Sequence, residues 1–199
     1  MKIIKPSVEL IDEVNANDVY KKIERCGRVC YQSEPKGNPE DFVRMLIKRG
    51  HESVLEHVSL TFHIICDRAI QNELVRHRLA SFSVESTRYV KYDELKVISD
   101  AEVALQHVTD FKNALKRLEK LYKYAVNSGG VPPEHARDIL PLCLKSELYM
   151  TANLREWRHI LKLRTSKHAH PQMRTIANSI LAVFKDKLPV IVEDIKNGC

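Results

Sequence analysis

The segment 58–78 carries two periodicities, and it constrains the fold more than any other part of this chain. Every second residue from Val58 to Ile64 is apolar, which is the pattern of a half-buried strand. Asp67 follows as a helix cap, and the helix after it leads to an Arg-His-Arg triplet at 76–78. The sequence therefore predicts a strand that passes directly into a helix ending at two arginines.

Helices account for most of the other predicted elements. We expect them at 17–31, 40–49, 100–127, 132–140 and 153–164, the second and the last capped by Asn38 and Asn153, with a final helix from Pro171 that can bend at Pro189. We expect loops at 33–39 and 79–86 and an extended segment at 89–98, while 145–151 stays open between strand and helix. No repeat or linker is evident in the sequence, so we expect a single domain, 1–199.

The composition is that of an ordinary globular protein, and we expect this protein to be cytoplasmic. No apolar run approaches the roughly 20 residues that cross a bilayer, and residues 1–9 lack the apolar core of a secretory signal. The five cysteines are odd in number and scattered, which indicates neither a disulfide framework nor a zinc site. His168 and His170 have the spacing of metal ligands but no third ligand nearby, so we expect no metal.

The charge of the chain favours anionic partners. A net charge of +6 and a pI near 9.0 suit nucleotides, nucleic acid or membrane surfaces, and charge alone does not choose among them. Between Arg68 and Val90, however, there are four arginines and no lysine. Because the planar guanidinium holds phosphate or carboxylate oxygens in two places at once, this bias indicates a site shaped for an anion.

The triplet at 76–78 is followed, after seven residues, by Ser86, Thr87 and Arg88. Alone, the triplet has a structural interpretation, because cations at the C-terminal end of a helix complement its dipole. Hydroxyl groups and backbone N–H groups beside an arginine instead make a phosphate pocket. The two segments together favour that pocket, with Glu85 as a candidate acceptor for a base or sugar.

Two further clusters have both a structural and a functional interpretation. Residues 50–57 read as a capping box that starts at Ser53. In 153–164 an apolar stripe runs through Trp157 and is continued by Arg164. A guanidinium turned inward needs an acceptor, because an unpaired buried charge costs several kcal/mol. An anionic ligand, a carboxylate partner and fraying of the helix end all remain open.

The pattern Arg76-His77-Arg78, seven residues and Ser86 resembles the signature of the flavin-dependent thymidylate synthases. Further blocks of that family follow the same order: 50–57, 88–89, 136–137 with 140–141, 153–155, and Arg164 with the histidines at 168 and 170. The resemblance spans nearly the whole chain. It implies an α/β (α+β) fold with a central mixed or antiparallel sheet flanked by helices, and a homotetramer whose active sites are shared between subunits.

The resemblance also implies roles for individual residues. FAD would be held by Ser53, Arg76, His77, Arg78, Asn153, Leu154, Arg155 and His159. The substrate dUMP would lie against Glu73, Leu74, Val75 and Arg76 of one subunit and against Val84, Glu85, Ser86, Thr87 and Arg88 of another, with Arg137 assisting at the phosphate. Arg164 would be catalytic, stabilising ionisation of the uracil N3. Val84 stands where the family often has an acidic or amide residue, so any contact there would be made by the backbone.

The implied reaction moves the methylene of methylenetetrahydrofolate to C5 of dUMP. Reducing equivalents pass from NADPH through FAD, and the product is dTMP. The reaction requires no cysteine nucleophile, and none of the cysteines has the sequence signature of one. Two alternatives differ in class: a nucleic-acid-binding module, and a flavoprotein oxidoreductase without methyl transfer. An aromatic content of 7% gives the first little support, since few stacking platforms are available. We therefore expect neither nucleic acid nor a membrane as a partner.

Overall fold

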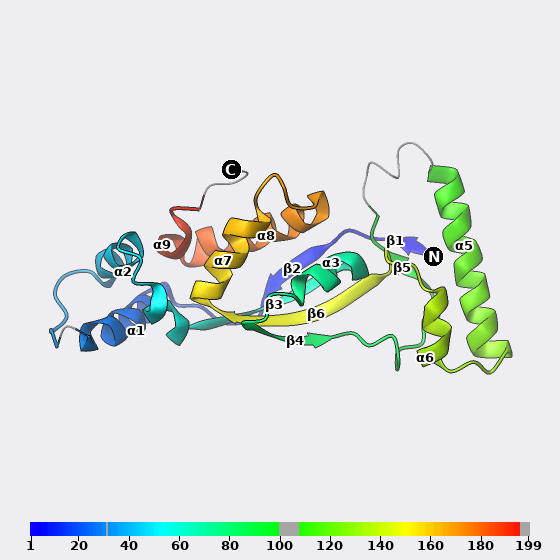
Figure 1. Ribbon diagram of the computed structural model, residues 1–199, viewed down its shortest axis with the longest axis horizontal. Coiled ribbons are helices and arrows are strands. Elements are labelled where there is room, and N and C mark those ends of the chain that lie inside the picture. The colour runs from blue at the N-terminus through cyan, green and yellow to red at the C-terminus, as the bar shows by residue number, and fades with distance from the viewer. Residues whose placement is uncertain (31, 100–107, 196–199) are drawn as a thin grey trace. The chain divides into compact units, whose positions relative to one another are not determined.

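The computed structural model describes residues 1–30, 32–99 and 108–195 (Figure 1). The chain divides into two compact units. Unit 1 comprises Met1–Ser7, Ile64–Arg76 and Ser83–Tyr149; unit 2 comprises Val8–His63, His77–Phe82 and Met150–Cys199. The single domain expected from the sequence stays a prediction.

The strands form two sheets. The larger one has the order β2 (Ser7–Leu10), β3 (Ser59–Asp67), β6 (Lys145–Asn153) and β4 (Ala80–Val84). The smaller one pairs β1 (Lys2–Ile3) with β5 (Lys96–Val97) in parallel. The predicted strand at 58–64 is confirmed as part of β3, and 145–151, which stayed open, belongs to β6. The combination of sheets and helices confirms the expected α/β class.

Unit 2 is built from helices on the first part of β3. They are α1 (Ala16–Val29), α2 (Pro39–Lys48), a 3₁₀ helix (Glu52–His57), α7 (Leu154–Arg164), α8 (Pro171–Lys187) and α9 (Pro189–Val192). Asn15, Asn38 and Asn153 cap α1, α2 and α7 with their side chains. These caps confirm the predicted helix starts. At Pro189, where we expected a bend in one final helix, the structure has two separate helices, α8 and α9.

The core of unit 2 centres on Trp157 of α7, which is fully buried. Its ring meets the ring of Phe62 edge-on at 4.9 Å between centroids, and Phe184 of α8 lies 5.8 Å from Phe62. The indole Nε1 donates a hydrogen bond to the Leu60 carbonyl at 3.0 Å. Strand β3 and helices α7 and α8 are thereby joined through aromatic packing, and α7 is fixed in position.

Unit 1 contains α3 (Arg68–Leu74), α5 (Val108–Lys123), a π-helical turn (Tyr124–Ser128), α6 (Pro133–Ala136) and a 3₁₀ turn (Arg137–Ile139). The carboxylate of Asp67 accepts from the Ile70 N–H at 2.7 Å, which confirms the predicted cap. The helix expected at 100–127 is confirmed from 108 onward, and 100–107 lie outside the described residues. Helix α5 packs against the 3₁₀ turn that follows α6 (Figure 1).

Three local predictions were wrong. The expected loop at 79–86 is largely strand β4, because Ala80, Phe82 and Val84 are half-buried while the serines between them are exposed. The expected extended segment at 89–98 contains only the short strand β5 and begins in a turn. The capping box at Ser53 is also absent, since that residue lies inside the 3₁₀ helix, which has no side-chain cap.

None of the helices in the described ranges is long and apolar enough to span a membrane.

Candidate functional site

The N-terminal turn of α7 organises the candidate site in unit 2. The Asn153 side-chain oxygen accepts from the Glu156 N–H at 2.9 Å, so the helix starts at a fixed point immediately after strand β6. Asn-x-x-Glu is also the pattern of a capping box, in which the glutamate would reach back to the cap residue. Here the carboxylate of Glu156 lies instead beside His77.

His77, Glu156 and Arg164 form a connected group that is largely shielded from solvent. The Arg164 Nε donates a hydrogen bond to His77 Nε2 at 3.1 Å. On the other side of the ring, His77 Nδ1 lies 3.5 Å from Glu156 Oε1. His77 has 6% of its surface exposed and Glu156 7%. Arg164, whose acceptor the sequence left open, thus meets a histidine predicted to hold the flavin.

The protonation state of His77 follows from these contacts. Burial, then the positive charge of Arg164, then His159 lower the pKa of His77 from 6.5 to about 4. The imidazole is therefore neutral at pH 7. Because Nε2 accepts from Arg164, its single proton must reside on Nδ1, the atom that faces Glu156. The pKa of Glu156 is raised instead, because burial disfavours its charged form, and the nearby His159 only partly offsets this rise.

His77, Glu156 and His159 could together bind a metal ion, since their ligand atoms lie within 4.8 Å of one another. A metal ligand needs a lone pair on the imidazole nitrogen. In His77 one nitrogen already accepts from Arg164, and the other carries the proton. A metal would therefore have to displace Arg164 or remove that proton, so the geometry favours an arginine-binding histidine.

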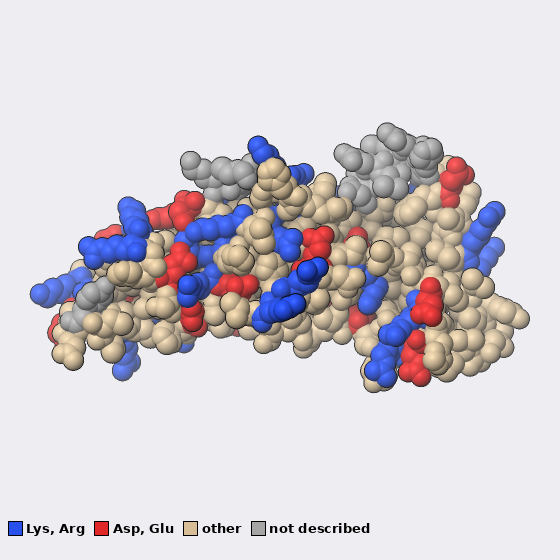
Figure 2. Space-filling view, viewed as in Figure 1, with Lys and Arg blue, Asp and Glu red and all other residues tan. Residues whose placement is uncertain are grey.

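A cavity of about 670 Å³ opens beside this group. It is lined by Glu52, Glu56, Leu79, Asn153, Arg155, Glu156, Arg158, His159 and Lys162. Basic and acidic side chains lie interspersed over this part of the surface (Figure 2). Three predicted flavin-binding residues, Asn153, Arg155 and His159, line the cavity. Its size falls in the usual range of ligand pockets.

The two arginines in the cavity wall differ in freedom. Arg155 is about half exposed and pairs with the equally exposed Glu56 at 2.6 Å. Arg158 has 1% of its side chain exposed, and its guanidinium binds the carboxylates of Glu52 and Asp194 as well as the Ile191 carbonyl. Arg155 can thus turn towards a ligand, whereas Arg158 holds α7 to its neighbours.

The other predicted flavin residues occupy varied positions. Ser53 and Arg78 are exposed and do not line the cavity, and Leu154 is fully buried in the core. Arg76 is exposed and is the last residue of the segment Ile64–Arg76 of unit 1. Sequence reasoning missed Glu156, although its place three residues after a helix cap marked it as more than a surface acid.

The residues predicted to hold the nucleotide phosphate form a turn in unit 1. The Ser86 carbonyl accepts from the N–H groups of Tyr89 and Val90, and the Ser86 hydroxyl accepts from the Arg88 N–H at 3.3 Å. Thr87 is buried. The Arg88 side chain is 55% exposed and lies 3.7 Å from Glu134 of α6. The exposed Arg137 follows α6 directly, so both arginines predicted at the phosphate contact or adjoin that helix.

Glu85 is engaged within the protein. Its carboxylate accepts from the Tyr92 hydroxyl at 2.7 Å and from the Lys145 ammonium at 2.5 Å. Strand β6 also holds the backbone of Glu85, whose N–H donates to the Glu147 carbonyl at 2.8 Å. Glu85 therefore anchors the turn at Ser86, and Val84 beside it is half-buried. In α3, Leu74 is buried and Glu73 is half-buried, and Val75, which follows the helix as its C-cap, is also half-buried.

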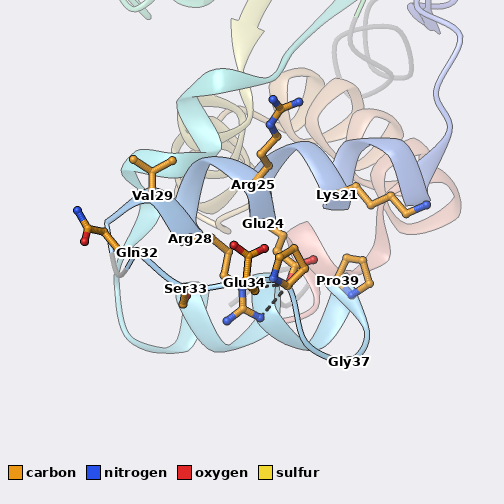
Figure 3. A pocket seen from close by; sticks show the side chains of 11 residues that line it. Lys21, Glu24, Arg25, Arg28, Val29, Gln32, Ser33, Glu34, Gly37 and Pro39 are labelled. Carbon is orange, nitrogen blue, oxygen red and sulfur yellow. Dashed lines mark hydrogen bonds and ion pairs between the residues drawn. The ribbon is translucent and has the colours of Figure 1, made fainter.

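A larger cavity, of about 800 Å³, lies at the C-terminal half of α1 and contains none of the predicted site residues (Figure 3). Some of the charged side chains that line it already have partners within the protein. Arg28 pairs with the buried Glu24 at 2.9 Å and lies over the Phe42 ring at 4.0 Å. Of these two cavities, the one by α7 is therefore the one that contains predicted site residues.

Together, the fold and the site define an α/β protein with a polar cavity whose wall carries both acidic and basic side chains. Residues 9–190 match the family described as "Thymidylate synthase complementing protein". The chain is 36% identical to the flavin-dependent thymidylate synthase of Mycobacteroides abscessus, over 86% of this chain and 78% of that protein. It is 33% identical to a probable flavin-dependent thymidylate synthase of Mycobacterium phage L5, over 89% and 81% of the two chains.

A solved structure agrees with these matches. The UMP/dUMP methylase PolB of Streptomyces cacaoi, bound with 5-Br dUMP, superposes with a TM-score of 0.84 at 26% identity, covering 97% of this chain and 96% of that one. The chain therefore belongs to the flavin-dependent thymidylate synthases, a family of enzymes.

Proposed function

We propose that this enzyme methylates dUMP to dTMP with a flavin cofactor. The observation that carries the proposal is the match to flavin-dependent thymidylate synthases over most of the chain. In the proposed reaction the C5–H of dUMP is replaced by a methyl group. Methylenetetrahydrofolate gives the carbon, NADPH gives the electron pair, and tetrahydrofolate and NADP⁺ leave.

The donor set by α7 fits a flavin nucleotide, and we assign the cofactor as FAD. Arg155 and Lys162 offer cations for a pyrophosphate, and the exposed His159 lies at the same cavity. Ser53, Arg76, His77, Arg78, Asn153 and Leu154 complete the proposed cofactor-binding set. When bound, the flavin supplies the redox chemistry, and the protein supplies orientation and charge.

For dUMP, the turn after β4 is the proposed phosphate site. Ser86, Thr87, Arg88 and Arg137 would bind the phosphate oxygens, while Glu85 keeps the turn in place from within. Glu73, Leu74, Val75 and Arg76 are the proposed partners of the base and sugar, and Val84 would contribute through its backbone. Guanidinium groups and N–H donors are the groups that recognise phosphate most strongly.

Arg164 is the proposed catalytic residue. Its positive charge would favour loss of the uracil N3 proton and stabilise the resulting anion, which activates C5 for bond formation to carbon. The hydrogen bond to His77 holds the guanidinium in one orientation, so little reorganisation is needed during the reaction.

Two of the five cysteines, Cys66 and Cys143, are poorly suited to act as a thiolate nucleophile. Burial is the main reason why the pKa of Cys66 is raised to about 12, and it also raises the pKa of Cys143. A thiol with a raised pKa is a poor nucleophile at neutral pH.

We further propose that the enzyme is a cytoplasmic homotetramer with active sites shared between subunits. Residues predicted to bind one nucleotide are contributed by several separate segments of the chain, which is compatible with sites completed by assembly. The molar mass in solution, measured by light scattering, tests the tetramer.

The decisive experiment is an assay of the purified protein. We expect a yellow protein whose flavin absorbance bleaches with NADPH, and formation of dTMP only when dUMP and methylenetetrahydrofolate are both present. A protein that oxidises NADPH but forms no dTMP would be a flavoprotein oxidoreductase, and the proposed methyl transfer would be rejected. Omitting the folate provides the control.

A further inference from the structure

We propose that Glu156 is a positioning residue that fixes the His77 tautomer and, through it, the orientation of Arg164. The inference rests on the proposed catalytic role of Arg164 and extends it to a residue outside the predicted site. His77 bridges the other two, with Nδ1 3.5 Å from the Glu156 carboxylate and Nε2 3.1 Å from Arg164 Nε.

The donors and acceptors of Arg164, His77 and Glu156 are compatible with only one tautomer of His77. The Arg164 Nε–H can only donate, so His77 Nε2 must present its lone pair. A neutral imidazole then carries its proton on Nδ1, and that proton needs an acceptor inside the protein. The Glu156 carboxylate is the group beside Nδ1. In the opposite tautomer an N–H would face the Arg164 N–H, and the hydrogen bond would be lost.

The position of Glu156 in α7 makes a buried carboxylate acceptable there. Glu156 is the third residue of the helix, where the unpaired N–H groups and the helix dipole favour negative charge. Its own N–H is bound by Asn153. The carboxylate is therefore held by the start of the helix, while Arg164 stands at the other end of α7. The same helix therefore carries both Glu156 and Arg164, and His77 lies between these two side chains.

The first test reads the tautomer directly. In the ¹⁵N-histidine-labelled enzyme at pH 7, we expect His77 to show a protonated Nδ1 and an unprotonated Nε2. In Glu156→Ala we expect a mixture of tautomers. A wild-type spectrum with the proton on Nε2 would overturn the proposal, whether or not any variant folds. This readout does not require catalytic activity, so it remains valid if the proposed function fails.

The second test separates positioning from binding. We expect Glu156→Ala to lower kcat for dTMP formation about 10-fold, the low end of the effect of an orienting partner, with KM for dUMP changed less than about twofold. Glu156→Gln should restore most of kcat, because its amide oxygen accepts the same N–H. An unchanged kcat in Glu156→Ala, or a failure of glutamine to rescue it, would refute the inference.

Helix α1 provides a matched control. Asp18 is likewise the third residue of a helix capped by an asparagine, since Asn15 accepts from its N–H at 3.3 Å. Asp18 is exposed. Asp18→Ala removes an acid from the same helical position without a histidine beside it, so kcat and the His77 tautomer should not change. A loss of kcat like that in Glu156→Ala would point to a general effect of helix charge and reject the assigned role.

Discussion

At the scale of single residues, Arg158 shows how a buried charge can be structural within a candidate site. It lines the cavity by α7, yet its guanidinium binds two carboxylates and a backbone carbonyl. Burial opposes the charged form of Asp194, but its hydrogen bond and ion pair with Arg158 lower its pKa to about 2. Arginine in a ligand cavity is thus insufficient evidence for ligand binding.

We expect Arg158→Met to lower the free energy of unfolding by about 3–5 kcal/mol, because it leaves buried acceptors without their partner. The neighbouring Arg155→Met is the control. Its ion pair with Glu56 is about half exposed, so the loss should stay below about 1 kcal/mol. Urea unfolding of both variants measures the difference. Equal losses would contradict the distinction between the two arginines.

At the scale of elements, the start of α7 couples stability to the site. Asn153 caps the helix by accepting from the Glu156 N–H, and both residues line the cavity. Asn38 caps α2 in a similar way, accepting from the Glu40 N–H at 3.1 Å, and does not line this cavity.

We expect Asn153→Ala and Asn38→Ala each to cost about 1 kcal/mol of stability, the usual contribution of an N-cap. Only Asn153→Ala should also weaken flavin binding, because the first turn of α7 shapes the proposed cofactor site. Thermal unfolding and the flavin absorbance of the purified variants check both parts. If Asn38→Ala lost flavin while Asn153→Ala kept it, the assignment of the cavity by α7 as the flavin site would be contradicted.

Local signals were enough to predict the elements that position the site. The caps at Asp67 and Asn153 and the alternation in β3 are confirmed because each depends on residues adjacent in sequence. Strand β4 was missed because its exposed serines looked like a loop, although its larger residues also alternate. The pairing of His77 with Glu156 joins residues far apart in the chain, and no local pattern could reveal it.

At the scale of the whole molecule, His77 links the candidate site to the pH dependence of folding. Its pKa is about 4 in the folded state, against 6.5 for an ordinary histidine. Among the residues that the structure describes, the titratable or charged groups that face it are Glu156, His159 and Arg164, all from α7. Between these two pKa values the unfolded chain binds a proton that the folded chain does not.

The protein should therefore lose stability as pH falls from 6.5 to 4, by up to about 3 kcal/mol from this histidine. Stability is retained above pH 6.5, and below pH 4 this loss is complete. Asp194 acts in a separate window, because its lowered pKa removes stability only as pH falls from 3.8 to about 2. The melting temperature measured across pH 4–7 tests the prediction. His77→Gln, which cannot titrate, should show a flatter profile, and a wild-type profile equally flat would mean that His77 is not held neutral by its surroundings.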